Sequence, residues 1–295
     1  MIDQSDDFPN RYSGSSVEAS AKKGSRVMDI GKEVSQKTKE SIAQPSSLNL
    51  PMNADLSGSE LNSLVESRLQ IKQMKELNPL SPVELSKKKI IHPEMKEKQV
   101  INKFRSLRTK LFGHDFRNNS VVLVCTTHEG GGSTFFAINL AAAIALEESK
   151  TSLLIDCNLN NPSITETFGL KGEVGLTDYL EDPNVDLEKI IYPSGISRYR
   201  VIPVGTSLES SSEFFTSVRM RQLLQLARER YSDRYVILDT PPVLGSADTS
   251  ILAPLCNKLL VVAPYGEVSE DDFSRTIETV GPERVTGVIL NEKLI

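Results

Sequence analysis

Short apolar runs alternate with helical stretches from residue 120 to the end of the chain. Six runs are rich in Val, Ile and Leu: Val121–Cys125, Ser152–Ile155, Val201–Val204, Tyr235–Leu238, Leu259–Val262 and Val288–Leu290. Helical patterns separate most of them, as at Phe135–Leu146, Val218–Arg230 and Asp271–Val280. Apolar strands joined by helices are typical of a parallel sheet that is buried on both sides. The pattern therefore predicts an α/β fold, an open and mostly parallel sheet with helices on both faces.

The N-terminal part of the chain has a different pattern. Residues 1 to about 55 show no apolar period and are rich in Ser, Lys, Asp, Glu and Gln, which predicts disorder because little apolar surface can offset the ordering entropy. Ser57–Glu60 then resembles a capping box, and it predicts an amphipathic helix near 58–77. The sequence thus predicts a largely disordered segment over 1–92 and a folded domain over 93–295.

A second helix is predicted from Pro93, a residue type suited to the first helical position. Its apolar residues recur at helical spacing and form one stripe: Val100, Phe104, Leu107 and Leu111. Residues 99–117 hold five basic side chains and one acidic, whereas 118–295 hold 14 basic and 24 acidic. This basic helix on an acidic domain either contacts an acidic surface or is a solvated helix face, and charge alone leaves both interpretations open.

Length and composition exclude several classes of protein. The 295 residues have a net charge of −5, which argues against a nucleic-acid binder. The longest strongly apolar run, Ala137–Leu146, is about half of what a bilayer span needs, and the first residues lack the apolar core of a secretory signal. The three cysteines form no CxxC motif, so neither a disulfide framework nor a zinc cluster is indicated. A cytoplasmic protein is expected.

A glycine-rich loop follows the first predicted strand. Its residues Gly130–Thr134 lead into a helix, and such a turn points backbone N–H groups at one spot where the helix dipole favours an anion. This is the geometry of a P-loop, which also needs a lysine beside its Ser or Thr. Ser133 occupies that lysine position, and no Lys or Arg occurs between Asn118 and Glu148. Because phosphoryl transfer depends on charge stabilisation, the missing cation predicts poor turnover.

Two aspartates end later predicted strands. Asp156 closes the run Leu153–Asp156, and Asp239 closes the run Tyr235–Asp239. Ligands of open parallel sheets bind along the carboxyl edge where such residues lie. Three apolar residues followed by Asp, after a glycine loop, is the pattern of a carboxylate that holds Mg²⁺. A single strand-end Asp is more often a cap or turn residue, but two of them after the loop are more specific.

These motifs occur in the order found in a known family. The glycine loop with its helix, Leu153–Pro162 and Ile237–Pro242 resemble the Walker A, Walker A′ and Walker B motifs of bacterial tyrosine kinases of capsule and exopolysaccharide synthesis. These kinases are deviant-Walker P-loop proteins related to septum-site and partition ATPases. The resemblance covers about residues 95–295.

The resemblance implies roles for particular residues. ATP and Mg²⁺ would be the cofactors, and the nucleotide-binding residues would be Gly130, Gly131, Gly132, Ser133, Thr134 and, near the base, Asn291. The residues at the metal would be Thr134 and the catalytic pair Asp156 and Asp239. The segment Asn102–Thr109 resembles the family's ring motif, so Arg105 and Arg108 would contact a neighbouring subunit or a membrane-anchored partner.

The chain also departs from the family pattern. Ser133 replaces the Walker A lysine, Asn158 the second Walker A′ aspartate, and Asn160–Asn161 the basic pair after it. Asn102 replaces the ring-motif glutamate, and the last tyrosine, Tyr265, lies before the final strand rather than in a C-terminal tyrosine cluster. Nucleotide charge, metal ligation, ring contacts and phosphate acceptor are therefore each weakened.

Three functions remain open at this stage. The first is a catalytically weak or inactive kinase-like regulator of polysaccharide export, recruited to the inner face of the membrane by a membrane-anchored chain-length determinant and able to form homo-oligomers. The second is an active ATP-dependent tyrosine autokinase that uses Tyr12, Tyr179 or Tyr265 as acceptor. The third is a partition- or septum-type positioning ATPase, which ranks last because its signature lysine, expected near Thr127 or His128, is missing.

Overall fold

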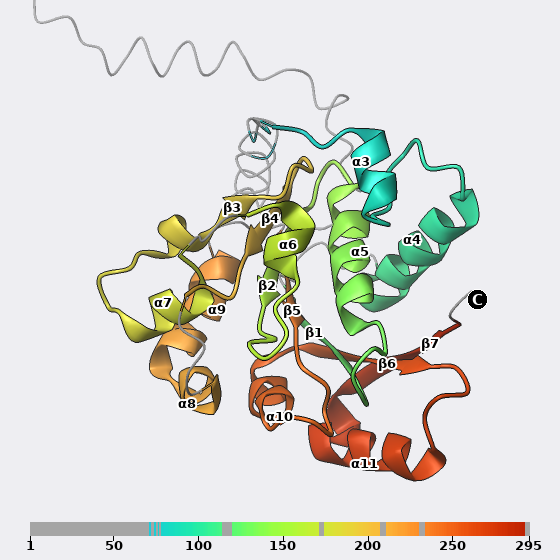
Figure 1. Ribbon diagram of the computed structural model, residues 1–295, viewed down its shortest axis with the longest axis vertical. Helices are drawn as coiled ribbons and strands as arrows, with labels where there is room; N and C mark the ends of the chain where they lie inside the picture. The colour runs from blue at the N-terminus through green and yellow to red at the C-terminus, as the bar shows by residue number, and fades with distance from the viewer. Residues whose placement is uncertain are drawn as a thin grey trace, which may run out of the picture. The chain divides into compact units, whose positions relative to one another are not determined.

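The computed structural model describes residues 71, 74, 76, 78–113, 120–170, 174–206, 211–229 and 234–292, all within the unit Leu56–Ile295. Its centre is a seven-stranded sheet in the order β3-β4-β2-β5-β1-β6-β7 (Figure 1). The strands are β1 Val121–Thr126, β2 Thr151–Asp156, β3 Tyr192–Pro193, β4 Tyr199–Ile202, β5 Arg234–Asp239, β6 Lys258–Pro264 and β7 Val285–Asn291. Every pairing is parallel except that of β3 with β4. The predicted α/β fold with a mostly parallel sheet is confirmed.

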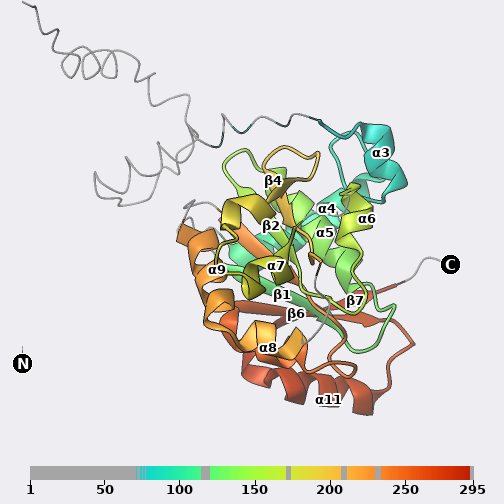
Figure 2. The ribbon, with the colours of Figure 1, turned by 60° about the vertical axis from the view of Figure 1, so that its left-hand side comes forward.

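Helices cover both faces of this sheet (Figure 2). One face packs on α3 Pro82–Lys87, α4 Lys98–Phe112, α5 Ser133–Ala145 and α6 Ile164–Phe168. The other packs on α7 Leu176–Glu181, α8 Ser211–Thr216, α9 Val218–Glu229, α10 Asp248–Leu252 and α11 Glu270–Val280. Strands β1, β2 and β5 are buried along their whole length because both of their faces are covered.

The helix α5 is the most buried helix of the described chain. Ten of its thirteen residues are buried, since β1, β2 and β5 lie on one side of it and α4 on the other. Its one buried amide, Asn139, donates to the carbonyls of Lys89 and Phe135 and accepts from the N–H of Ile91. The polar residue within the apolar run therefore holds the chain between α3 and α4 against α5.

Two details of the predicted organisation need correction. The helix predicted from Pro93 begins at Lys98, because Pro93 and Glu94 lie in a turn in which the N–H of Met95 donates to the carbonyl of His92. The two-residue strand β3 was missed, since so short a strand leaves no apolar run in the sequence.

The structure describes only some of the residues to which the predictions for the N-terminal part apply. The helix predicted near 58–77 falls almost wholly outside the described residues. The domain division at residue 92 stays a prediction, and the structure adds that Ile90 and Ile91 pack in the same apolar cluster as α4 and α5. No helix among the described residues is long and apolar enough to cross a membrane.

Candidate nucleotide site

The glycine loop between β1 and α5 needs glycine for two different physical reasons. Gly130 and Gly132 have φ angles of +74° and +93°, which side chains rarely adopt. At Gly131 a Cβ atom would lie 1.8 Å from the hydroxyl oxygen of Thr126, so there is no space for one. Gly132 also precedes the first residue of α5, and no side chain caps that end of the helix. The backbone N–H groups of the first turn are therefore presented as in a P-loop.

A cavity of about 250 Å³ opens above this loop. It lies at the carboxyl edge of the sheet, where ligands of open parallel sheets bind. Its lining comes from the glycine loop, the loop after β2 and the loop after β5: Thr126, Glu129, Gly130, Gly131, Gly132, Ser133, Thr134, Asn158, Asn160, Asn161, Pro241, Pro242, Gly245 and Ser246. The loop residues predicted to bind nucleotide thus surround one cavity, together with the three asparagines that depart from the family pattern.

The charge of this cavity is unusual for a phosphate site. Among the described residues that line it, none is basic, and Glu129 is the one ionisable side chain. Ser133, at the lysine position, is 7% exposed. His128, the nearest other candidate, points elsewhere: its Nε2 lies 3.1 Å from Oδ2 of Asp272 on α11. An anion in the cavity would meet backbone dipoles but no full positive charge from these residues.

The two strand-end aspartates lie side by side beneath the loop. Asp156 and Asp239 are paired in the β2–β5 register, and both are essentially inaccessible to solvent. Burial raises the pKa of Asp156 to about 7, although N–H groups of Asn158, Ile164 and Ser163 hydrogen-bond to the carboxylate and lower it. Burial and the neighbouring charge of Asp156 raise the pKa of Asp239 well above its ordinary value. The structure therefore brings the predicted pair together, below the cavity rather than in its lining.

The two carboxylates have different surroundings. Both oxygens of Asp156 are occupied, because one accepts from the N–H of Asn158 (3.1 Å) and the other from the N–H of Ile164 (3.2 Å). Asp156 thus holds the loop after β2 in place. The oxygens of Asp239 are buried without a well-formed hydrogen bond among the described residues, and the nearby Thr134 hydroxyl lowers the pKa of Asp239.

These residues fit one part of a Mg²⁺–ATP site and not another. A buried carboxylate without well-formed hydrogen bonds next to a hydroxyl is the oxygen donor set that Mg²⁺ prefers, so Asp239 and Thr134 are suited to hold a metal. The glycine loop is suited to a phosphate. The charge needed to stabilise the terminal phosphates is not present among the described lining residues.

Asn291 contacts the glycine loop directly. Its side-chain amide donates to the carbonyl of Gly131 at 3.1 Å, and a Cβ atom on Gly132 would lie 2.6 Å from the same nitrogen. Asn291 ends β7 and does not line the cavity. Its role near a nucleotide base stays a prediction, and the contact shown is with the loop backbone.

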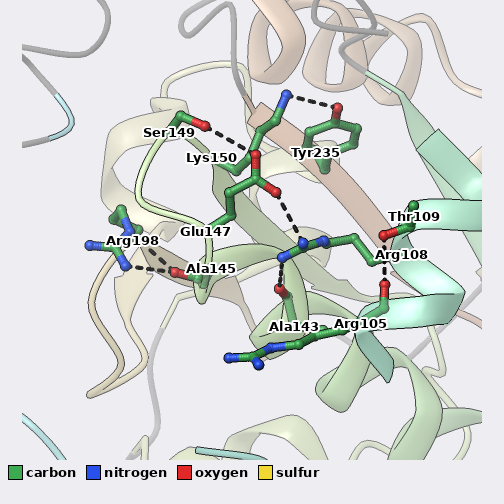
Figure 3. Close-up of polar contacts among 10 residues, drawn as sticks. All are labelled: Arg105, Arg108, Thr109, Ala143, Ala145, Glu147, Ser149, Lys150, Arg198 and Tyr235. Carbon is green, nitrogen blue, oxygen red and sulfur yellow. Dashed lines mark hydrogen bonds and ion pairs between the residues drawn. The ribbon is translucent and has the colours of Figure 1, made fainter. Parts of the chain in front are cut away.

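The two arginines predicted to contact a partner differ in their surroundings (Figure 3). Arg108 faces inward: it donates to the carbonyl of Ala143 at 2.9 Å and pairs with Glu147 at 3.3 Å. Arg105 is exposed, and no dashed line in Figure 3 joins its guanidinium to the residues drawn. Arg198 donates twice to the carbonyl of Ala145, so two arginines bind the C-terminal end of α5.

The fold and the glycine loop define a P-loop-type α/β protein, and comparison with known proteins places it in a family. The family model described as "AAA domain" matches residues 120–288. The chain therefore belongs to this AAA-domain family, and its relatives are bacterial tyrosine kinases.

Two relatives and one solved structure illustrate this. The putative tyrosine-protein kinase EpsB of Ralstonia solanacearum is 32% identical over 65% of this chain and 25% of its own length. The tyrosine-protein kinase etk of Escherichia coli (strain K12) is 32% identical over 63% of this chain and 26% of its own length. The structure of the kinase domain of Escherichia coli tyrosine kinase ETK matches 74% of this chain and 88% of that chain, with 27% identity and a TM-score of 0.61. The chain spans about a quarter of the length of these two curated relatives.

Some residues of the site could not be found from the sequence. Gly245 and Ser246 line the cavity because the chain turns back after Pro242, and no motif marks them. The contact of His128 with Asp272 joins residues 144 positions apart, and only the packing of α11 near the loop brings them together. The three asparagines at the cavity depart from the family pattern in the sequence, but their joint place in its lining is a result of the fold.

Proposed function

We propose that this chain is a kinase-like regulator of capsule or exopolysaccharide export whose own nucleotide chemistry is weak or absent. It would act as a partner of a membrane-anchored polysaccharide co-polymerase that determines chain length, and the chain would be recruited to the inner face of the membrane through that partner. The relatives named tyrosine kinases support the family, and the departures within the glycine loop support the loss of activity.

The observation that supports this proposal best is the charge of the cavity. A glycine loop with suitable metal donors, Thr134 and Asp239, adjoins a described lining in which no residue is basic and Glu129 is acidic. A hydrogen bond to a charged group is worth about 1.5–3 kcal/mol, which corresponds to roughly 10- to 150-fold in affinity. A triphosphate would lose that contact here and would also meet the charge of Glu129.

The direct test measures ATP binding by calorimetry and phosphotyrosine by immunoblot, on the full chain with Mg²⁺. We expect no saturable binding at millimolar ATP and no phosphotyrosine. Micromolar binding together with phosphotyrosine, both lost in Asp156→Ala, would contradict the proposal and support the active autokinase. The exposed Tyr265, at 70%, would then be the first acceptor to examine.

A lysine introduced at position 133 tests whether the missing cation limits ATP binding. Ser133→Lys should increase ATP affinity by about 10- to 100-fold, because the ammonium would lie at the first turn of α5 beside the phosphates. Ser149→Lys, which adds the same charge beyond the other end of α5, is the matched control and should leave affinity unchanged. Equal gains in both variants would mean that net charge, not the loop, limits binding.

The partner role needs a separate measurement. Co-expression with a two-helix chain-length determinant encoded in a neighbouring reading frame should give a complex that survives purification in detergent. A determinant that purifies without this chain under the same conditions would contradict the regulatory role, whatever the nucleotide site does.

A further inference from the structure

Charge is strongly segregated between two parts of this molecule. Residues 82–112, which contain α3 and α4, hold nine basic and three acidic side chains. Residues 118–295, which contain the whole sheet, hold 14 basic and 24 acidic side chains. Both helices of the basic part lie on the α5 side of the sheet, whereas α10 and α11 cover the opposite face (Figures 1 and 2). The chain is therefore polarised, with excess positive charge on the α3–α4 layer.

Three of the nine basic side chains are used within the molecule. Lys88 donates to the carbonyl of Thr167, Lys98 donates to that of Pro93, and Arg108 binds the end of α5. The other six are exposed, and none forms an ion pair with another described residue: Lys87, Lys89, Lys96, Lys103, Arg105 and Lys110. We call these six residues the basic surface.

The basic surface is held on a rigid support. On α4, Lys103 and Lys110 are seven residues apart, which is two turns, so they lie on the same side of the helix. A different side of the helix packs through Phe104 against Phe135 and Phe136 of α5. The chain that precedes α4 is held by the buried amide of Asn139. These cations therefore project from packed elements and not from a free tail.

An apolar side chain accompanies the cations on α3. Val83 is 64% exposed and lies four residues before Lys87, so the two share one side of that helix. A single exposed apolar side chain is common on protein surfaces, and this one lies where it would add an apolar contact to the attraction between lysines and an anionic membrane.

The composition of the basic surface favours lipid over protein as its partner. Five of the six cations are lysines, whose compact charge on a flexible stem suits diffuse attraction, whereas paired carboxylates on a protein are preferentially recognised by the planar fork of arginine. The six cations lie on α3, on the segment between α3 and α4, and on α4 itself. Clusters of four to eight basic residues are typical of binding to anionic phospholipids. We propose that the basic surface binds an anionic phospholipid bilayer directly. This binding is independent of the nucleotide site and of any protein partner, so it would hold even if the proposed function were wrong.

The test is co-sedimentation of the full chain with vesicles. One vesicle is phosphatidylcholine alone, and the other is phosphatidylcholine with about 30% phosphatidylglycerol, which gives it a negative surface potential. We expect binding to the anionic vesicle only, and the binding should weaken as salt is raised because the Debye length shortens. Equal binding to both vesicles, or none to either, would overturn the proposal.

Variants separate the basic surface from net charge. The triple variant Lys96→Gln, Lys103→Gln, Lys110→Gln should lower partitioning onto the anionic vesicle by about 100-fold, since each basic residue contributes roughly fivefold. The matched control removes three exposed cations elsewhere: Lys189→Gln, Arg221→Gln and Arg284→Gln. It should bind nearly as tightly as the wild type. Equal losses in the two variants would overturn the assignment to this surface.

Two further measurements test whether the variants are folded and whether Val83 contributes to vesicle binding. Far-UV circular dichroism confirms that both triple variants are folded, and Val83→Asp should weaken vesicle binding with all six cations retained. If the chain instead forms salt-sensitive oligomers without vesicles, and the first triple variant abolishes them, the basic surface is an interface between copies of this chain and the lipid proposal fails.

Discussion

The two ends of helix α5 differ in the charged side chains that lie near them. At the C-terminal end, Arg108 and Arg198 donate to the carbonyls of Ala143 and Ala145 (Figure 3). At the N-terminal end, no side chain caps the helix, and the cavity above it has no basic residue among those that the structure describes. A helix dipole favours cations at its C-terminus and anions at its N-terminus, so the first end is matched and the second is left for a ligand.

Cations near the two ends of α5 would have different roles, one in stabilising the fold and the other in binding a ligand. The arginines at the C-terminal end stabilise the fold, because Arg108 also joins α4 to Glu147. A cation at the N-terminal end would serve a bound phosphate, and the residue at that position is Ser133, which is 7% exposed. The glycine loop is thus formed as in a P-loop, while the described residues that line its cavity include no cation. Substitutions at each end test this separation.

The largest effect is expected where the loop is tightest. Gly131→Ala would place a methyl group 1.8 Å from the Thr126 hydroxyl oxygen, so strand and loop must move apart. We expect a loss of about 3 kcal/mol in the free energy of unfolding, measured by urea denaturation. Gly245→Ala is the control, since its Cβ would meet nothing closer than 3.8 Å. A small loss in Gly131→Ala would show that the loop is more open than described.

The next effect concerns the carboxylates beneath the loop. Their pKa values are raised by burial, so the folded state keeps protons that the unfolded chain, with an ordinary value of 3.8, releases. Stability from this pair is therefore complete below about pH 4 and decreases as pH rises, for Asp156 through its folded-state pKa of about 7. Asp239→Asn should raise the free energy of unfolding at pH 7.5 and flatten that pH dependence, because a buried amide stays neutral at every pH.

Two controls complete this prediction. The exposed Asp186→Asn should leave both the stability and its pH profile unchanged. A lower stability of Asp239→Asn at pH 7.5 would mean that the buried carboxylate is ionised and stabilised in the folded protein, as expected if it has a cation partner.

A smaller effect is expected at the C-terminal end of α5. Arg108→Ala and Arg198→Ala should each lower the free energy of unfolding by about 1–2 kcal/mol, because each leaves a helix-end carbonyl without its charged donor. Arg105→Ala, on the same helix as Arg108 but exposed, should change it by less than about 0.5 kcal/mol. Equal losses at Arg105 and Arg108 would contradict the distinction between them.

The smallest effect involves the imidazole that points away from the cavity. Hydrogen bonds from Arg275, His128 and Ser269 lower the pKa of Asp272 to about 2. This carboxylate therefore favours the folded state above its ordinary pKa of 3.8, and the contribution is lost as pH falls toward about 2. His128→Ala should raise the pKa of Asp272, measured by NMR of the carboxyl carbon, and when combined with Ser133→Lys it should leave the ATP affinity of that variant unchanged. A gain or loss of affinity in the combined variant would place His128 in the nucleotide site.

Much of the fold could be predicted because the signals are local. The apolar runs of the sequence form β1, β2, β4, β5, β6 and β7, and helices cover them. Because strands buried in this way are apolar along their length, their composition predicted a parallel sheet. The glycine loop was equally visible, since side chains rarely adopt the φ of Gly130 and none fits at Gly131. The start of α4 was predicted five residues early because Pro93 is equally suited to the turn that it occupies.

The sequence by itself determined the type of fold, the family and the absence of a lysine at Ser133, because each depends on residues close together in the chain. Only the tertiary structure decided how the charges are used. In the folded chain Arg108 donates to α5, whereas Arg105 is exposed. Both oxygens of Asp156 accept hydrogen bonds from backbone N–H groups, whereas the carboxylate of Asp239 lies near the hydroxyl of Thr134. These outcomes depend on which segments pack together, and residues such as Arg108 and Ala143 are neighbours only once α4 lies on α5.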